Sequence, residues 1–196
     1  MKTQNSVLMK QAREALVGKW GLAVGATFVY ILIIIVARSI PKVGFIISLL
    51  IGGAMSLGLA IFSLALSRNQ NSKLEQIFEG FKRFGVSLIA YFMIILFILL
   101  WSLLLIIPGI IAALSYSMTF FIIADNNSIE ASEAIGLSKK MMMGNKWKLF
   151  RLGIAFIGWE LLGMLTLGIG FLWILPYFQV SLAKFYEDIK GGNMVA

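Results

Sequence analysis

The chain has 196 residues, of which 60% are apolar, and its 17 lysine and arginine residues exceed its 9 acidic residues to give a formal net charge of +8. Soluble domains are about 45 to 50% apolar, so this composition, with a mean hydropathy of +0.92, is typical of an integral membrane protein. The absence of cysteine and histidine excludes disulfides, thiolate or imidazole metal sites, and acid–base catalysis by histidine.

The first element that the sequence predicts is an amphipathic helix that ends before Trp20. Its apolar residues Leu8, Ala12, Ala15 and Leu16 fall on one side at helical spacing. Basic residues flank this apolar side, a pattern that suits a helix lying in the plane of the membrane surface. The sequence therefore predicts a cytoplasmic surface helix before the first apolar segment.

The same arrangement follows twice more along the chain. Residues 74–84 place Leu74, Ile77, Phe78, Phe81 and Phe84 at helical spacing beside lysine and arginine. Residues 127–147 alternate apolar positions with several lysines in the same way. We predict surface helices for both segments.

Between and after these helices the apolar residues form six blocks, several of them near the 17 to 25 residues that cross hydrocarbon as a helix. The predicted spans are 20–37, 45–66, 86–107, 110–124, 149–167 and 171–185. Pro108-Gly109 and the glycines at 168 and 170 leave almost no loop within two of the pairs, which predicts tight helical hairpins.

These elements suggest an internal repeat. Aromatic residues that open a span recur at intervals of 64 and 63 residues, at Trp20, Phe84 and Trp147. The predicted fold is an all-α membrane protein with six transmembrane helices as three hairpins, each preceded by a cytoplasmic amphipathic surface helix. It forms a single domain over residues 1–196, with repeats at 6–66, 72–126 and 128–188.

The basic residues predict the orientation. Fifteen of the 17 fall in segments that the hairpins place on one side, and only Arg38 and Lys42 fall on the other. Because cytoplasmic loops carry an excess of lysine and arginine, we expect both termini and all three surface helices in the cytoplasm.

Four stretches carry a resemblance to a known family: "IIPGIIAALSYSMTFFIIADN", "EAIGLSKKMMMGNKWKLF", "FIGWELLGMLTLGIGFLWILPY" and "SLAKFYEDI". Together they resemble an uncharacterised bacterial integral membrane family, the domain of unknown function nine-seven-five. More faintly, the chain is similar to the membrane region of some glycerophosphodiester phosphodiesterases. The resemblance implies a multi-pass protein of the bacterial plasma membrane with six helices, and it implies no activity or catalytic residue.

Glu160 is the main candidate for a binding residue, because it is a carboxylate inside an otherwise apolar predicted span. The small residues Gly153 and Gly163 lie near it at helical spacing, so we expect Glu160 to point into the bundle, close to Tyr177 or Gln179. No lysine or arginine is available at that depth, which favours a neutral acid that hydrogen-bonds to one of these two residues. Its role is either a structural hydrogen bond or a proton or cation site.

Four lysines in the third surface segment are the candidates for contact with lipid headgroups: Lys139, Lys140, Lys146 and Lys148. Each could contribute about 1 kcal/mol near an anionic membrane surface. Membrane lipids, anionic ones among them, are therefore the expected partners, with a protein partner at the cytoplasmic face as another candidate. No nucleic-acid fold is recognisable, so nucleic acid is not an expected partner. The sequence does not determine the oligomeric state.

No set of catalytic residues, metal site or cofactor motif is evident in the sequence. Asp125, Glu187 and Asp188 are expected to lie on solvated helix surfaces. We therefore expect a membrane protein that is not an enzyme and that contacts lipid or a partner in envelope organisation, stress response or protection. The alternative is a small transporter or channel, proton-linked through Glu160. A polar cavity that reaches Glu160 from both sides would favour that alternative.

Overall fold

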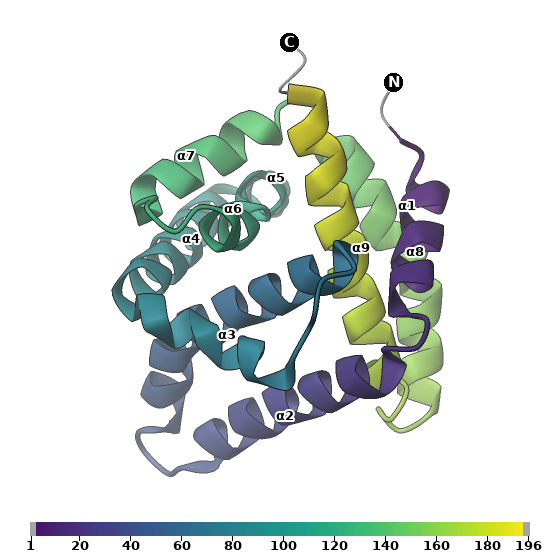
Figure 1. Cartoon of the computed structure of the whole chain (residues 1–196). Helices are drawn as coiled ribbons and strands as arrows, with labels where there is room; N and C mark the ends of the chain where they lie inside the picture. Colours follow the sequence, from purple (N-terminus) through teal and green to yellow (C-terminus); the bar gives the residue numbers. More distant parts are fainter. Residues whose placement is uncertain (1–2, 194–196) are drawn as a thin grey trace.

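The computed structural model describes residues 3–193, and every regular element in that part of the chain is helical (Figure 1). Helix η1 is a 3-10 helix and the others are α-helices. Their bounds are α1 Asn5–Leu16, α2 Trp20–Ser39, α3 Gly44–Ser67, η1 Leu74–Arg83, α4 Phe84–Leu104, α5 Ile106–Tyr116, α6 Thr119–Asp125, α7 Ala131–Met141, α8 Lys146–Leu165 and α9 Phe171–Asn193.

Within residues 3–193, four helical segments are long and apolar enough to cross a membrane, so the chain has the character of a membrane protein. They are Trp20–Ser39, Gly44–Ser67, Leu74–Leu104 and Ile106–Asp125. The fifth and sixth predicted spans coincide with α8 and α9, which carry more charge. Helix α8 includes Lys148, Arg151 and Glu160 along its length. That all six segments cross the membrane stays a prediction.

The turn predicted at Pro108-Gly109 lies instead at Leu105, an extended residue between α4 and α5. Pro108 falls in the first turn of α5, where its missing N–H has no helical partner to lose. Gly109 is needed because a Cβ there would lie 2.1 Å from the Ser102 hydroxyl of α4. The proline therefore lies in the first turn of the second helix of the pair and not in the connection between the two helices.

Two predicted elements differ from expectation, one in its extent and one in its packing. The predicted fourth span is two helices, α5 and α6, separated by a turn at Ser117 and Met118. In α1, Leu8 and Leu16 face the interior of the fold and are buried, so the apolar side that was expected to meet lipid meets other helices. It packs against α9 and α3.

Helix η1 lies across α3 and touches it backbone to backbone. A Cβ on Gly58 of α3 would lie 1.8 Å from the carbonyl oxygen of Ile77, and a Cβ on Gly80 of η1 would lie 1.9 Å from that of Ala54. Ile77 is fully buried in this contact, whereas Phe78 keeps 41% of its surface exposed. The expectation that residues 74–84 turn their apolar side to lipid is therefore only partly correct, because glycines on both helices permit this closer contact.

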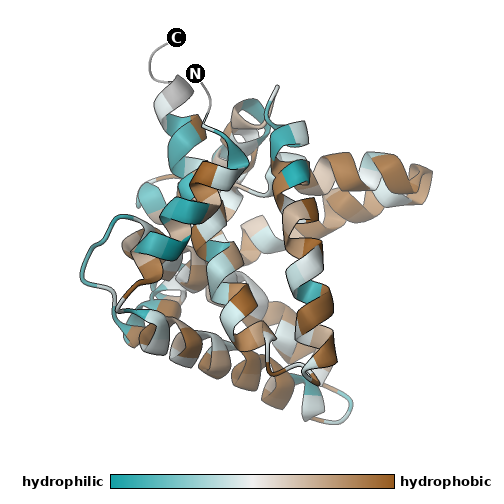
Figure 2. Ribbon diagram, turned by 90° about the vertical axis from the view of Figure 1, so that its right-hand side faces the viewer, coloured by the Kyte–Doolittle hydropathy of each residue, from teal (hydrophilic) through white to brown (hydrophobic). Residues whose placement is uncertain are grey.

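The consecutive helix pairs extend in different directions. In Figure 1, α2 and α3 run across the lower half of the view, while α8 and α9 run down its right side. Figure 2 shows the strongly apolar α4–α5 pair standing out from the rest of the fold. The largest core cluster joins α3, α6, α7, α8 and α9, with Leu57, Phe121, Ala134, Leu152 and Phe185 among its buried residues.

Candidate functional site

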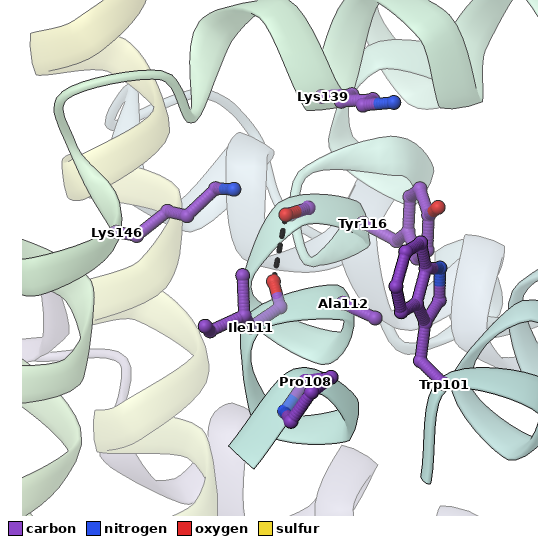
Figure 3. A pocket seen from close by; sticks show the side chains of 8 residues that line it. Trp101, Pro108, Ile111, Ala112, Tyr116, Lys139 and Lys146 are labelled. Carbon is purple, nitrogen blue, oxygen red and sulfur yellow. Dashed lines mark hydrogen bonds between the residues drawn. The ribbon is translucent and has the colours of Figure 1, made fainter. Parts of the chain in front are cut away.

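A cavity of about 310 Å³ lies where the α4–α5 pair meets α7 and the start of α8 (Figure 3). Helices α4 and α5 supply mainly apolar walls, and α7 and α8 supply one lysine each. The lining residues are Trp101, Pro108, Ile111, Ala112, Ser115, Tyr116, Lys139 and Lys146. The cavity therefore combines an apolar interior with two cationic groups.

Local hydrogen bonds fix the walls of this cavity. The Ser115 hydroxyl donates to the Ile111 carbonyl at 2.6 Å, the bond drawn in Figure 3. The Ser138 hydroxyl of α7 donates to the Ser115 carbonyl at 2.8 Å and accepts the Met118 N–H at 3.2 Å. Since Ser138 is buried and precedes Lys139, these bonds hold α7 in the position that places Lys139 at the cavity.

The two cavity lysines carry charges that no acid neutralises within the described part of the chain. Neither the Lys139 nor the Lys146 ammonium group lies within 4.0 Å of a carboxylate there. Figure 3 shows Lys139 reaching from α7 above the cavity and Lys146 reaching from α8 beside it, with Trp101 and Tyr116 next to each other at the far wall. This arrangement suits a ligand with an anionic group and an apolar body.

The other two predicted headgroup lysines occupy different environments. Lys140 is exposed on α7 and does not line the cavity. Lys148 forms an ion pair of 2.5 Å with Asp188, and only 16% and 11% of the two side chains remain exposed. Burial raises the pKa of Asp188, but hydrogen bonds from Lys148 and Thr3 outweigh it and lower that pKa. The Lys148 charge is therefore already neutralised inside the fold.

A second ionic cluster joins the ends of α3, α6 and α9. Arg68 pairs with Asp125 at 2.7 Å and with Glu187 at 2.6 Å. Lys190 also pairs with Asp125, which accepts a further hydrogen bond from the Tyr186 hydroxyl at 3.1 Å. The expectation that Asp125 and Glu187 are simply solvated is therefore wrong, and the same holds for Asp188. The sequence could have predicted these pairs, because each of these acidic residues has a basic residue at the same end of a neighbouring predicted span.

The structure places Glu160 differently from expectation. Its side chain is exposed, and among residues 3–193 neither Tyr177 nor Gln179 hydrogen-bonds to it. Tyr177 instead donates to the Met9 carbonyl at 3.3 Å. The prediction that Glu160 points into the bundle is wrong, because a carboxylate without a cationic partner is costly to bury. A proton-carrying role for Glu160 stays a prediction.

Helical spacing puts Glu160 beside the residues of α8 that contact α9, but its side chain is exposed. Helix α9 contacts α8 at Gly163, where a Cβ would lie 2.9 Å from Ile174, and aromatic rings pack around Phe156 one turn before Glu160.

Among the described residues, no group of three or more acidic side chains is arranged to hold a metal ion. The cavity beside Lys139 and Lys146 is therefore the strongest candidate site.

Comparison with known proteins identifies a family. A family model described as "Protein of unknown function (DUF975)" matches residues 1–110 and 102–193. No curated protein and no solved structure matches the chain. The fainter similarity to the membrane region of glycerophosphodiester phosphodiesterases is not shown by these comparisons.

Proposed function

The chain belongs to the DUF975 family of unknown function, and we propose that it is a bacterial plasma-membrane protein that binds an anionic phospholipid in the cavity between α4–α5 and α7–α8. The observation that carries this proposal is that Lys139 and Lys146, which have no acidic partner in the described part of the chain, line a mainly apolar cavity. The protein acts without catalysis, in envelope organisation, stress response or protection.

The chemistry of the cavity supports a phospholipid over a soluble anion. Its walls of Trp101, Ile111 and Tyr116 match hydrocarbon, while the two ammonium groups match a phosphate. A volume of about 310 Å³ is at the lower end for ligand pockets. It therefore accommodates the headgroup region and the first part of an acyl chain, and the rest of the lipid stays in the bilayer.

The charge distribution supports an orientation in which the α7–α8 junction faces the cytoplasm. This junction carries Lys139, Lys140 and Lys146, and Trp147 follows with 66% of its surface exposed. Tryptophan is enriched at membrane interfaces and lysine on the cytoplasmic side. Both termini are then cytoplasmic, on the same side as this junction.

Removing both cavity charges should release the bound lipid. For Lys139→Gln with Lys146→Gln we expect anionic phospholipid that copurifies with the protein to fall by about 30-fold, since each lysine contributes about 1 kcal/mol. Quantitative lipid mass spectrometry of the detergent-purified protein measures the change. The effect should weaken as salt concentration rises, because salt screens the attraction.

The double variant Lys73→Gln with Lys140→Gln is the matched control. It removes two charges from exposed lysines that do not line the cavity. We expect it to retain most of the anionic lipid. An equal loss in the control would show that all four lysines act only through general electrostatic attraction. No loss of lipid in the cavity variant would exclude the cavity as the site.

The orientation has its own test, which uses the natural absence of cysteine. We expect Ile40→Cys to react with a membrane-impermeant maleimide in intact cells, because it lies in the turn between α2 and α3 beside Arg38 and Lys42. Gln70→Cys should react only in inverted membrane vesicles. Labelling of position 70 but not position 40 in intact cells would show that the orientation is reversed.

A further inference from the structure

The helix pairs differ in the length of helix between the last basic residue and the turn that joins the two helices of the pair. The α4 segment from Arg83 to the turn at Leu105 covers 22 residues, or about 33 Å at 1.5 Å per residue. The α8 segment from Arg151 to the turn after Leu165 covers only 14 residues, or about 21 Å. A bilayer has a hydrocarbon core of about 30 Å, so α4 is long enough to cross it and this part of α8 is not.

Helix α9 has the same limitation. Its uncharged part, from Phe171 to Lys184, covers 13 residues, or about 20 Å. Lys184 is anchored at the base of the fold, where its ammonium group donates to the Ser67 carbonyl. Both helices of the α8–α9 pair are therefore too short to span hydrocarbon from their last basic residue to their turn.

The outward-facing residues along this pair indicate a shallow position. Glu160 is exposed, and Trp159 and Trp173 each keep 49% of their surface exposed. An ionised carboxylate at the bilayer centre is expensive, and tryptophan prefers the interface between headgroups and hydrocarbon. These three side chains are accommodated best if the middle of the pair lies near the headgroups.

The turn of this pair, in contrast, is apolar and highly exposed. Leu165, Leu167 and Ile169 keep 78%, 94% and 61% of their surface exposed. From 161 to 183 the sequence contains no charged residue, whereas the turn between α2 and α3 lies beside Arg38 and Lys42. The α8–α9 turn therefore suits hydrocarbon and does not suit the aqueous phase beyond the membrane.

We propose that the α8–α9 pair is a re-entrant hairpin, which dips into the membrane from the cytoplasmic side and returns without crossing it. Leu165, Leu167 and Ile169 insert into hydrocarbon, while Glu160 lies nearer to the cytoplasmic headgroups than this turn does. The bilayer is the partner of this surface. The inference rests on the proposed orientation, but not on lipid binding in the cavity.

Single cysteines test the depth of the pair, since the chain has no cysteine of its own. The variants are Glu160→Cys and Leu167→Cys, with Ile40→Cys and Met143→Cys as references for the outer and cytoplasmic sides. All four positions are exposed, so the substitutions should not disturb packing. Each variant is treated with a membrane-impermeant maleimide in intact cells, in inverted membrane vesicles and after denaturation in detergent.

We expect Glu160→Cys to react in inverted vesicles together with Met143→Cys, and not in intact cells. Leu167→Cys should react at least about tenfold more slowly than Ile40→Cys in intact cells and than Met143→Cys in inverted vesicles, because the reactive thiolate is disfavoured in hydrocarbon. It should react fully after denaturation. Rapid labelling of Leu167→Cys from the outer side would show that the pair crosses the membrane. Failure of Glu160→Cys to react on the side of Met143→Cys would also overturn the proposal.

The two references separate this inference from the proposed orientation. If Ile40→Cys and Met143→Cys exchange sides, the orientation is wrong, and the re-entrant hairpin is then judged only by whether Glu160→Cys shares the side of Met143→Cys. Copurification of lipid is not part of this measurement. Its failure for the cavity variants would leave the labelling pattern unaffected.

Discussion

Gly58→Ala should lower the free energy of unfolding by about 3 kcal/mol, because the added methyl group overpacks a contact between two backbones. The new Cβ would lie 1.8 Å from the Ile77 carbonyl oxygen and 2.5 Å from its carbon. No flexible side chain can move aside, so η1 must separate from α3. Thermal unfolding of the purified protein in detergent, followed by circular dichroism, measures the loss.

Gly136→Ala provides the matched control for that substitution. Gly136 also lies within a helix, α7, but a Cβ there would meet nothing within 4 Å. Alanine in an exposed helix is favoured over glycine by about 0.5 to 1 kcal/mol, so this variant should be slightly more stable than the parent. If both variants unfold at the same temperature, the close contact between η1 and α3 is wrong.

Arg68→Gln should lower the free energy of unfolding by about 2 kcal/mol, since it leaves two carboxylates without their shared cation. Asp125 retains Lys190, whereas Glu187 loses the only ion pair that the described residues give it. Removing one partner of a buried pair costs about 3 to 5 kcal/mol, and the 29% exposure of Arg68 reduces that figure through solvent screening. Chemical unfolding in detergent provides the measurement.

A surface ion pair gives the comparison for Arg68. Lys10 and Glu14 lie 4.0 Å apart with 78% and 63% of their side chains exposed, so Lys10→Gln should cost less than about 0.5 kcal/mol. Adding Glu187→Gln to Arg68→Gln should recover part of the stability, because it removes the uncompensated charge. Equal stability of the Arg68 and Lys10 variants would show that the cluster contributes nothing beyond an exposed pair.

Composition and periodicity were sufficient to predict most of the helices. The apolar blocks correspond to α2, α3, α4 and the α5–α6 segment, and the buried side of α1 contains the predicted Leu8 and Leu16. These features depend on the spacing of neighbouring residues. A helix that is apolar on all sides, such as α4, gives no such information about which of its sides faces protein and which faces lipid.

Contacts between distant segments could not be predicted in the same way. Arg68 and Glu187 are 119 positions apart, and Arg83 donates to the carbonyls of Ile123, Asn126 and Ile129, which are 40 to 46 positions away. Glu160 was misplaced because helical spacing relates it to Gly163, which α9 does contact, but does not show that the Glu160 side chain itself stays exposed. The sequence did predict Lys139 and Lys146 as candidates, but only the fold separates them from Lys140 and Lys148.

The ionic contacts of α9 have a consequence for the order of biosynthesis. Between Lys184 and Lys190, this helix contacts Ser67, Arg68, Asp125 and Lys148, which belong to segments translated earlier. While α9 is still inside the ribosome, those earlier segments are already in the translocation machinery with their polar groups unmatched. These ionic contacts can therefore form only after the last described helix has been made.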